Sequence, residues 1–209
     1  MNYNFYSYSY SCSYSYYYYI KIVIIINYHS QNNNLTDEYA LKALEKLYSL
    51  HSLIPQLIHS TNMRSERAWF EFWLPILSGL GQQCYHSSKD VRQSALVYLQ
   101  RALLSNDLES NSNANFWSDC FDNVLFPLLE ELLKKEVYNL DPYGMDETMA
   151  RASSLMCKIF LHYFSKINSK ELERVWSNML QYLCRYLFAA KSEFLVNNNN
   201  DNKYLLLID

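Results

Sequence analysis

The chain has 209 residues and half of them are hydrophobic, which is enough for one ordinary domain or a run of helical repeats with a substantial core. With 3 Gly and 4 Pro, it has too few turn residues for an all-β protein and too few glycines for a phosphate-binding loop. Its formal net charge of −3 offers nucleic acid no bulk attraction, so no nucleic-acid partner is expected.

Cysteine usage and hydropathy indicate a cytoplasmic protein. The five Cys are dispersed and odd in number, and no secretory signal precedes them, a pattern typical of reduced thiols. No hydrophobic run in the sequence has the length that spans a bilayer.

The two ends of the chain differ in composition from the middle. Residues 1–34 alternate Tyr, Ser and Asn around a short run of Ile and Val, which is typical either of a disordered N-terminus or of a gene-model artefact from repetitive DNA. Residues 192–209 form an Asn-rich tail. We therefore expect an ordered α-helical repeat domain at residues 35–191 and assign no function to either end.

Six amphipathic helices are predicted between these ends, from apolar residues that recur at helical spacing. Thr36 is a suitable N-cap for the first helix, and Ser87 with Asp90 has the form of a capping box for the third. Asn168 with Glu171 repeats that form before the last helix. The predicted helices cover approximately residues 36–58, 65–84, 87–105, 115–133, 146–164 and 169–190.

Proline and glycine are expected to interrupt some of these helices. Pro55 should kink or end the first helix, because proline lacks the backbone N–H that the helix requires. Gly79 and Gly81 are expected to break the second helix near its end. Asp141 and Gly144 belong to the loop that precedes the fifth helix, which is predicted to begin near residue 146.

The third helix is the centre of the predicted core. Val91, Ala95, Leu99 and Leu103 form its apolar stripe, whereas Gln100 falls on the opposite side. Leu96, Val97 and Leu104 widen the apolar arc. Because so wide an arc cannot face water, this helix should be flanked by other helices on two sides.

An internal repeat organises the helices into pairs. Leu74–Leu77 (LPIL) matches Phe126–Leu129 (FPLL) about 52 residues later, and Arg92 near the start of one second helix matches Arg151 in the next. A proline in the first helix and an Asp-Val-Arg at the start of the second are similar to HEAT repeats. The prediction is an all-α fold, a HEAT- or TPR-like α-solenoid of about three antiparallel helix pairs.

Candidate catalytic and metal-binding groups are sparse. Cys84 and His86 lie close in sequence and could form a thiolate–imidazole pair or two metal ligands, but no further ligands cluster with them. Asp141, Asp146 and Glu147 could form a carboxylate cluster, although an acidic loop running into a helix N-terminus is the favoured interpretation. No catalytic residue, metal, cofactor or small-molecule substrate is therefore predicted.

Four residues are candidates for structural or interaction roles. Arg92 and Arg151 are interpreted as a stacked polar ladder between successive second helices, with binding of an acidic partner as the alternative. Trp176 lies on a second apolar stripe of the last helix, and Arg185 is one of its flanking basic residues. This helix is the best candidate for membrane contact, and packing of its stripes against a further repeat is the alternative.

The block from Trp69 to Phe188 resembles a known family. Three stretches carry the likeness: DVRQSALVYLQRALLS (Asp90–Ser105), FDNVLFPLLEELL (Phe121–Leu133) and GMDETMARASSLMCKIFLHY (Gly144–Tyr163). They resemble the region downstream of the catalytic domain in the large Golgi-type Arf guanine-nucleotide exchange factors, the Sec7-family brefeldin A-resistance group.

The resemblance implies a non-catalytic regulatory or membrane-recruitment region that acts in ER–Golgi vesicle transport and Arf signalling. Exchange activity in that family resides in a Sec7 domain, which has no counterpart in this sequence, so no catalytic residue is carried over. Expected partners are proteins and the Golgi membrane surface, with the chain peripheral on Golgi membranes and a fragment of a larger product. An independent α-solenoid adaptor with unrelated protein partners is the alternative.

Overall fold

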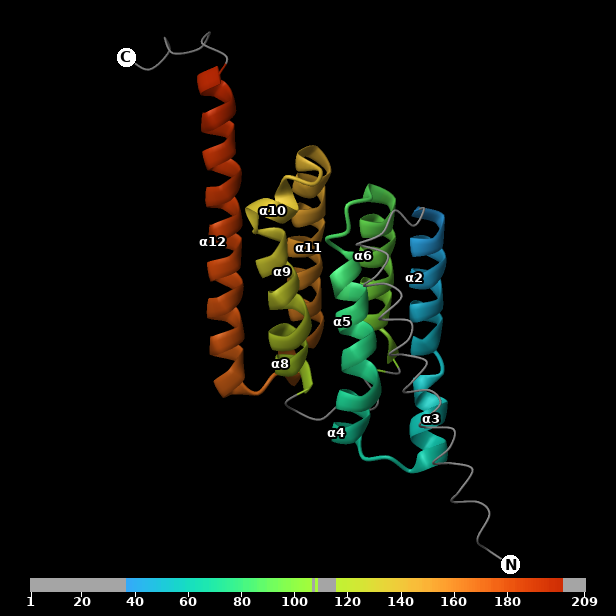
Figure 1. Cartoon of the computed structure of the whole chain (residues 1–209). Helices are drawn as coiled ribbons and strands as arrows, with labels where there is room; N and C mark the ends of the chain where they lie inside the picture. Colours follow the sequence, from blue (N-terminus) through green and yellow to red (C-terminus); the bar gives the residue numbers. More distant parts are fainter. Residues whose placement is uncertain (1–36, 107, 109–115, 201–209) are drawn as a thin grey trace, which may run out of the picture.

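A computed structural model of the chain describes residues 37–106, 108 and 116–200. Every regular element in these ranges is helical, and no strand occurs among them. The long helices stand side by side in one row, with consecutive helices antiparallel (Figure 1). The predicted all-α, solenoid-like architecture is therefore confirmed.

The elements follow one another with short connections. In chain order they are α2 (Asp37–His51), α3 (Ile54–Thr61), α4 (Ser65–Ala68), η1 (Trp69–Trp73), α5 (Leu74–Gln83), α6 (Lys89–Leu103), α8 (Phe116–Cys120), η2 (Phe121–Leu125), α9 (Phe126–Leu132), α10 (Lys135–Tyr138), α11 (Pro142–Tyr163), η3 (Phe164–Lys166) and α12 (Ser169–Asn200). The segments α4, η1 and α5 run on as one rod, and so do α8, η2 and α9.

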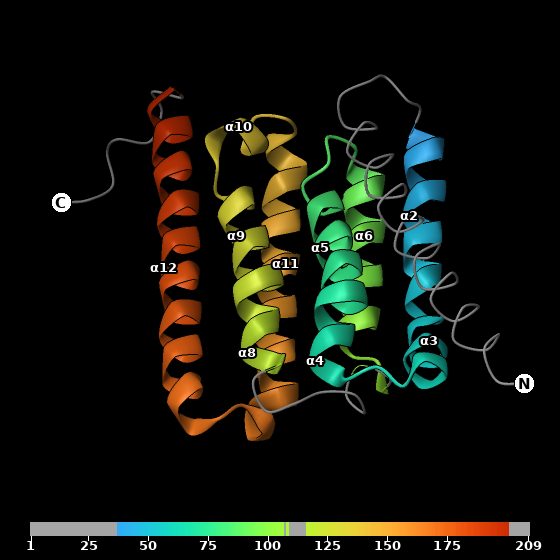
Figure 2. The ribbon, with the colours of Figure 1, turned by 60° about the horizontal axis from the view of Figure 1, so that its bottom comes forward.

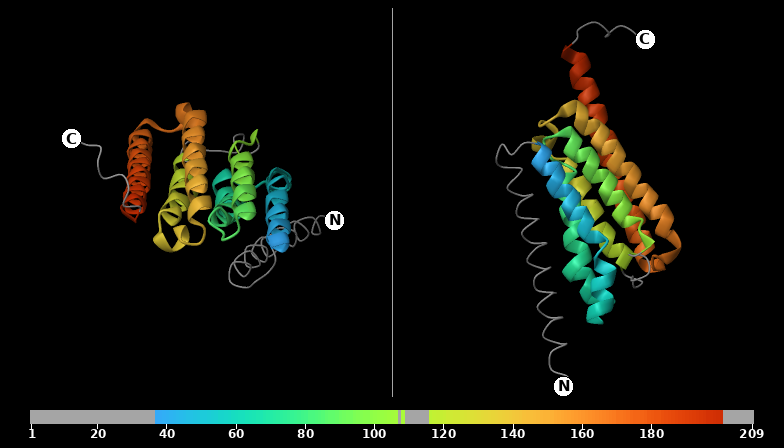
Figure 3. Two further views of the ribbon diagram at one scale, coloured as in Figure 1. Left: turned by 90° about the horizontal axis from the view of Figure 1, so that it is seen from above. Right: turned by 90° about the vertical axis from the view of Figure 1, so that its right-hand side faces the viewer.

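The rods are arranged in two layers. Seen from above, α6 and α11 lie on one side and α5 and α9 on the other (Figure 3). α6 packs on α5 and α11, and η2 packs on α5. α2 packs against α5 and α6 at one end of the row, and α12 packs against α8, α9 and α11 at the other (Figure 2). Within residues 37–106, 108 and 116–200, the stack therefore consists of two complete helix pairs with one further long helix on either side.

The two prolines of the internal repeat occupy equivalent places. Each first helix contains a π-helical turn, η1 or η2, that ends just before Pro75 or Pro127. The backbone N–H of Leu74 reaches back to the Trp69 carbonyl, five residues earlier, and Phe126 repeats this bond. Widening the turn accommodates a residue that cannot donate to the helix and whose ring crowds the preceding carbonyl. The sequence repeat therefore produces the same π-helical turn in both first helices.

Several predicted boundaries need correction. The first helix ends at His51, and Pro55 lies in the first turn of the separate helix α3, where its missing N–H costs nothing. Gly79 and Gly81 do not break the second helix, which continues to Gln83. Both glycines are buried, and Gly81 lies opposite η2, where a Cβ would be 3.8 Å from the Val124 side chain.

The predicted capping box at Ser87 is wrong. Helix α6 begins at Lys89, and the Ser88 side chain before it makes no capping hydrogen bond. Ser88 Oγ instead donates to Asp37 on α2 at 2.9 Å, and the Ser87 carbonyl accepts a bond from Arg92 at 2.8 Å. Neither of these two bonds is a side-chain cap of the α6 backbone.

The later helices are longer than predicted. α11 begins at Pro142, because Asp141 caps it and the proline occupies its first turn. α12 continues to Asn200, past the predicted end near residue 190. Asn168 Oδ1 accepts from the Lys170 N–H at 3.2 Å at its start. The proposed cap at Thr36 and the low-complexity residues 1–34 lie outside the described residues.

The core is one continuous apolar cluster along the row. Leu99 is fully buried at its centre, together with the other members of the predicted stripe of α6, Val91, Ala95 and Leu103. Val97 is an exception to the predicted wide arc, since its side chain is 43% exposed. The predicted core face of α11 is buried throughout: Met149, Ala152, Ser153, Met156, Ile159, Phe160 and Tyr163.

Leu99→Ala should lower the free energy of unfolding by about 2–5 kcal/mol, because the truncation leaves a cavity in a fully packed site. Gln100→Ala, on the partly exposed side of the same turn, should cost little. Denaturant melts of both variants would measure the difference. Equal sensitivity at the two positions would contradict the assignment.

Candidate interaction surface

The one fully buried charge among the described residues is Arg92, on the second turn of α6. Its guanidinium donates to the carbonyls of His86 and Ser87, each at 2.8 Å, and to Thr148 Oγ1 at 3.1 Å. It also forms an ion pair with Asp141. The acceptors come from the loop before α6 and from the start of α11, so this side chain joins two successive repeats.

Asp141 has two functions at this point. One carboxylate oxygen accepts from the Gly144 N–H at 3.1 Å and so caps α11, while the other binds Arg92. The hydrogen bond from Arg92, and then that from Gly144, hold the pKa of Asp141 below its usual value. A Cβ at Gly144 would overlap the Asp141 carboxylate and press on Arg92, so the close approach requires glycine.

Arg151 does not enter this buried site. Its side chain is 48% exposed and pairs with Glu147 at 2.7 Å on the same helix. Glu147 also binds Lys89 at 2.8 Å and accepts a long bond, 3.3 Å, from Gln93 on α6. Polar cross-links between α6 and α11 are therefore present, with Arg92 inside them and Arg151 at their solvent edge.

Cys84 and His86 both make local hydrogen bonds that hold them in place. Cys84 is fully buried, which raises the pKa of its thiol, and its Sγ donates to the Leu80 carbonyl. His86 Nδ1 accepts from the Ser88 N–H at 3.0 Å, and burial lowers the pKa of its ring. Within the described ranges, no group of three or more His, Cys, Asp or Glu side chains is placed to hold a metal ion.

The inner stripe of α12 closes the core at the end of the row. Val175 and Met179 are buried, and the ring of Tyr182 stacks on Phe126 of α9 with centroids 5.2 Å apart. Tyr186 continues the stripe as a half-buried residue packed on the core. These residues fix which side of α12 faces the stack.

The arginines that flank α12 are engaged with α8–α9. Arg174 makes two hydrogen bonds of 2.7 Å to Asp122 and a third, of 2.8 Å, to Glu171. Arg185 binds both oxygens of Glu130, and these hydrogen bonds lower the pKa of that carboxyl group. Arg174 and Arg185 are therefore paired with carboxylates of the neighbouring rod, which weakens the attraction of these two residues for anionic lipid.

The second stripe of α12 remains open on the surface. We define the α12 stripe as Trp176, Leu180, Leu183 and Leu187; Leu183 is half-buried, and the exposed fractions of the others are 47%, 44% and 65%. Trp176 contacts the α11 core residue Phe160, with ring centroids 5.4 Å apart, and Phe164 contacts the same ring. The stripe thus begins at the α11 edge and runs up α12.

Among the described helices, none has the length and apolarity needed to cross a bilayer. The polar groups that converge inside the molecule hold helices together, and the α12 stripe leaves three large apolar side chains exposed on the last helix. An arrangement of this kind defines a class of protein, the α-helical repeat, whose chemistry is recognition through side-chain surfaces.

Comparison with known proteins gives the particular family. A family model described as GBF1-like, tetratrico peptide repeat region matches residues 73–204, and the chain belongs to this family. The Golgi-specific brefeldin A-resistance guanine nucleotide exchange factor 1 homolog of Caenorhabditis elegans is 33% identical over 120 residues, 57% of this chain and 6% of the relative. The ARF guanine-nucleotide exchange factor GNOM of Arabidopsis thaliana is 31% identical over 119 residues, 56% of this chain and 8% of the relative.

A third relative, the ARF guanine-nucleotide exchange factor GNL1 of Arabidopsis thaliana, is 29% identical over 134 residues, 61% of this chain and 9% of the relative. The chain therefore spans less than a tenth of the length of these relatives. The resemblance noted in the sequence is confirmed. No solved structure matches the chain significantly.

Sequence reasoning missed two parts of this geometry. The carboxylates Asp122 and Glu130, which bind the arginines of α12, gave no local signal because their partners lie more than 50 residues away. The Asp141 cap had a signal in the run Asp-Pro-Tyr-Gly, since an N-cap aspartate followed by proline at the first helical position is a common helix start.

Asp141→Asn should lower the free energy of unfolding by about 3 kcal/mol, near the lower end of the range for breaking a buried ion pair. The substitution keeps a good N-cap but leaves the buried Arg92 without its counter-ion, and the Asp141 side chain is itself 32% exposed. Glu147→Gln, which breaks only exposed pairs, is the matched control and should cost much less. Equal losses in chemical denaturation would contradict the buried role.

The same pair predicts a pH dependence. Because the folded-state pKa of Asp141 is depressed, its contribution is fully present above its unfolded pKa of about 3.9 and is lost as pH falls through the folded value. The stability difference between the natural chain and Asp141→Asn should therefore be constant near neutral pH and shrink below about pH 4. Urea titrations at a series of pH values would measure it, and a difference that widens in acid would refute the assignment.

Proposed function

We propose that this chain acts as a non-catalytic regulatory and membrane-recruitment region of a Golgi-type Arf guanine-nucleotide exchange factor. In this role it lies in the cytoplasm, peripheral on Golgi membranes, and takes part in ER–Golgi vesicle transport and Arf signalling. Membership of the GBF1-like repeat family and the exchange-factor names of its relatives support the proposal.

The observation that carries the proposal is the distribution of polar and apolar side chains. The buried guanidinium of Arg92 donates to the carbonyls of His86 and Ser87 and to Thr148, and these bonds hold α6 to α11. On the surface, Trp176, Leu180 and Leu187 of the α12 stripe are among the exposed large apolar side chains. A surface of this kind supports recognition of a protein rather than conversion of a substrate.

The charges around α12 favour a membrane-resident protein as the contact over bare lipid. Arg174 and Arg185 are paired with Asp122 and Glu130, and the net charge of the whole chain is −3. Binding of an amphipathic helix to anionic lipid needs a basic polar face. Recruitment is therefore proposed to proceed through protein partners on the Golgi surface.

The purified chain should not accelerate nucleotide exchange on Arf, and it should bind Golgi membranes weakly through their proteins. The tests are a fluorescent nucleotide-exchange assay, with a Sec7-domain protein as positive control, and flotation with isolated Golgi membranes before and after protease treatment. Binding should be lost on treatment. Measurable exchange activity would overturn the non-catalytic role, and equal flotation with protein-free liposomes would show lipid to be the contact.

A further inference from the structure

His86 lies in the turn between α5 and α6, where a hydrogen bond that only the neutral ring can make holds its side chain. The residue is 5% exposed, and its Nδ1 accepts from the Ser88 N–H at 3.0 Å. A ring nitrogen accepts only when it carries no proton, so the ring hydrogen must reside on Nε2. Among the described residues no hydrogen-bond acceptor reaches Nε2, which is itself buried. The site therefore favours an uncharged imidazole.

The turn that contains His86 is bonded to two neighbouring helices. Ser88 Oγ donates to Asp37 at the start of α2 at 2.9 Å. Arg92 of α6 donates to the His86 carbonyl at 2.8 Å, and its charge is paired with Asp141 at the start of α11. The turn therefore links the start of α2 to the buried arginine that joins α6 to α11.

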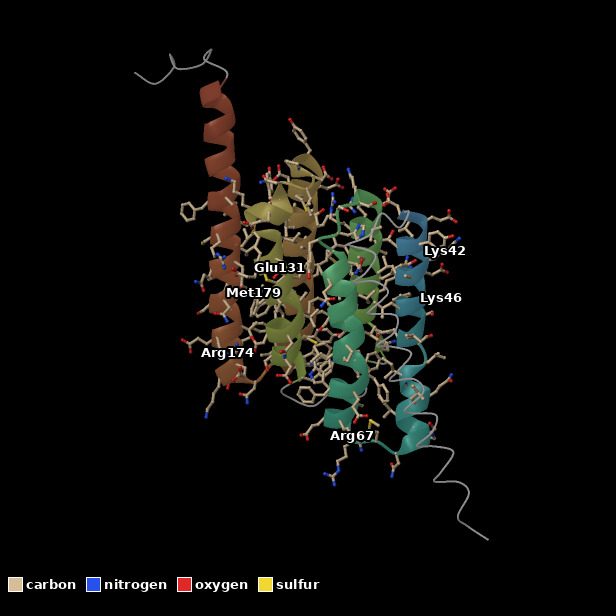
Figure 4. All side chains as sticks on the ribbon, viewed as in Figure 1. Lys42, Lys46, Arg67, Glu131, Arg174 and Met179 are labelled. Carbon is tan, nitrogen blue, oxygen red and sulfur yellow. The ribbon has the colours of Figure 1, made fainter. Side chains whose placement is uncertain are left out.

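Two charged side chains act on the His86 ring, and they have opposite effects. Asp37 is the one from α2, whereas Lys42 and Lys46 of the same helix point away from the stack (Figure 4). Arg92 is the one from α6. A proton added to the ring is therefore attracted by one neighbour and repelled by the other.

Burial decides the balance between these two charges. It is the largest cause acting on the pKa of His86 and lowers it below its ordinary value; Asp37 raises that pKa by less, and Arg92 lowers it again. Cys84 and Tyr85, the titratable groups just before His86, stay neutral from neutral pH into acid, because burial raises the pKa of both. The charge state of the turn therefore depends on His86.

We propose that His86 is a pH-sensitive switch for the α5–α6 turn: the neutral ring holds Ser88 in place against α2, and the protonated ring releases it. Protonation turns Nδ1 into a donor that faces the Ser88 N–H, so their hydrogen bond is lost and Ser88 moves away from Asp37. Leu44 and Leu47 still hold α2 in the core, so the start of α2 loosens while the stack persists. This regulatory device does not depend on the proposed function.

Acidification is the direction that opens the turn. Because the folded-state pKa of His86 is lowered, its contribution to stability is fully present above the unfolded pKa of about 6.5 and is lost as pH falls through the folded value. The contribution of Asp141 is lost only below about pH 4, so the two effects occur in separate pH ranges.

The first experiment follows hydrogen exchange of the Ser88 amide from neutral pH to about pH 5, in the full chain and in two variants. His86→Asn keeps a side-chain oxygen close to the place of Nδ1 but does not titrate, whereas His86→Gln carries its amide group further out. In the natural chain the protection factor of Ser88 should fall about tenfold in acid. It should stay constant in His86→Asn and be low throughout in His86→Gln.

Comparison with His86→Asn also cancels the titration of His51, the other buried histidine in the described ranges. Circular dichroism spectra would verify that both variants keep their helices. Equal loss of protection in the natural chain and in His86→Asn would overturn the proposal. So would a Ser88 amide in His86→Gln that is as protected at neutral pH as in the natural chain.

A second experiment observes the His86 ring itself, by NMR of its imidazole nitrogens. At neutral pH the ring hydrogen should be on Nε2, and the titration midpoint should lie below about 6.5. Asp37→Asn should move the midpoint to lower pH, because it removes the attraction of this carboxylate for the protonated ring. Glu38→Gln is the matched control: Glu38 pairs with Lys42 at 2.6 Å on the exposed side of α2, and its loss should leave the midpoint nearly unchanged. A ring hydrogen on Nδ1, or equal shifts in the two variants, would contradict the switch.

Discussion

The charge of Arg92 is the constraint on which the packing of the two repeats depends. A guanidinium removed from water must find acceptors for its donors and a negative charge nearby, or the burial costs several kilocalories per mole. The loop before α6 and the first turn of α11 supply them together. The ion pair with Asp141 requires α11 to begin where it does, and it requires Gly144 to have no side chain. The start of α11 and its contact with α6 are therefore linked at one place.

The remaining ion pairs also join helices, but they lie at the surface and each stabilises the fold less than a buried pair does. Glu147 binds Lys89 and Arg151, so it ties α6 to α11 on the solvent side. Arg174 and Arg185 tie α12 to the rod before it. Exposed pairs contribute little stability each, but they orient helices whose apolar contacts alone would allow sliding. In these ion pairs the positive charges of Arg174 and Arg185 are balanced by carboxylates, so they are less available to anionic lipid.

The ends of the row explain how such a structure can work through recognition. The helices in the middle bury most of their apolar residues in the core, although Phe70, Val97 and Leu161 stay exposed. α2 ends the stack with a polar face, whereas the α12 stripe leaves apolar side chains accessible. In the GBF1-like repeat family, a chain of this length is a small part of a much larger relative.

The sequence by itself determined the all-α class, the repeat and most of the core. Period 3.6 is a local property, so the stripe through Leu99 and the inner face of α12 could be read without coordinates. The matching prolines Pro75 and Pro127 marked the repeat, and the structure gives them a shared backbone geometry. Family membership also followed from the order and spacing of apolar residues along the chain.

Only the tertiary structure decided which polar residues are buried and which surfaces stay open. Arg92 and Arg151 occupy similar places in sequence, yet one is fully buried and the other lies at the solvent edge, because only Arg92 faces the first turn of the next second helix. The partners of Arg185 and Ser88 are likewise distant in sequence. Contacts of this kind depend on how rigid helices dock, and local spacing carries no information about that.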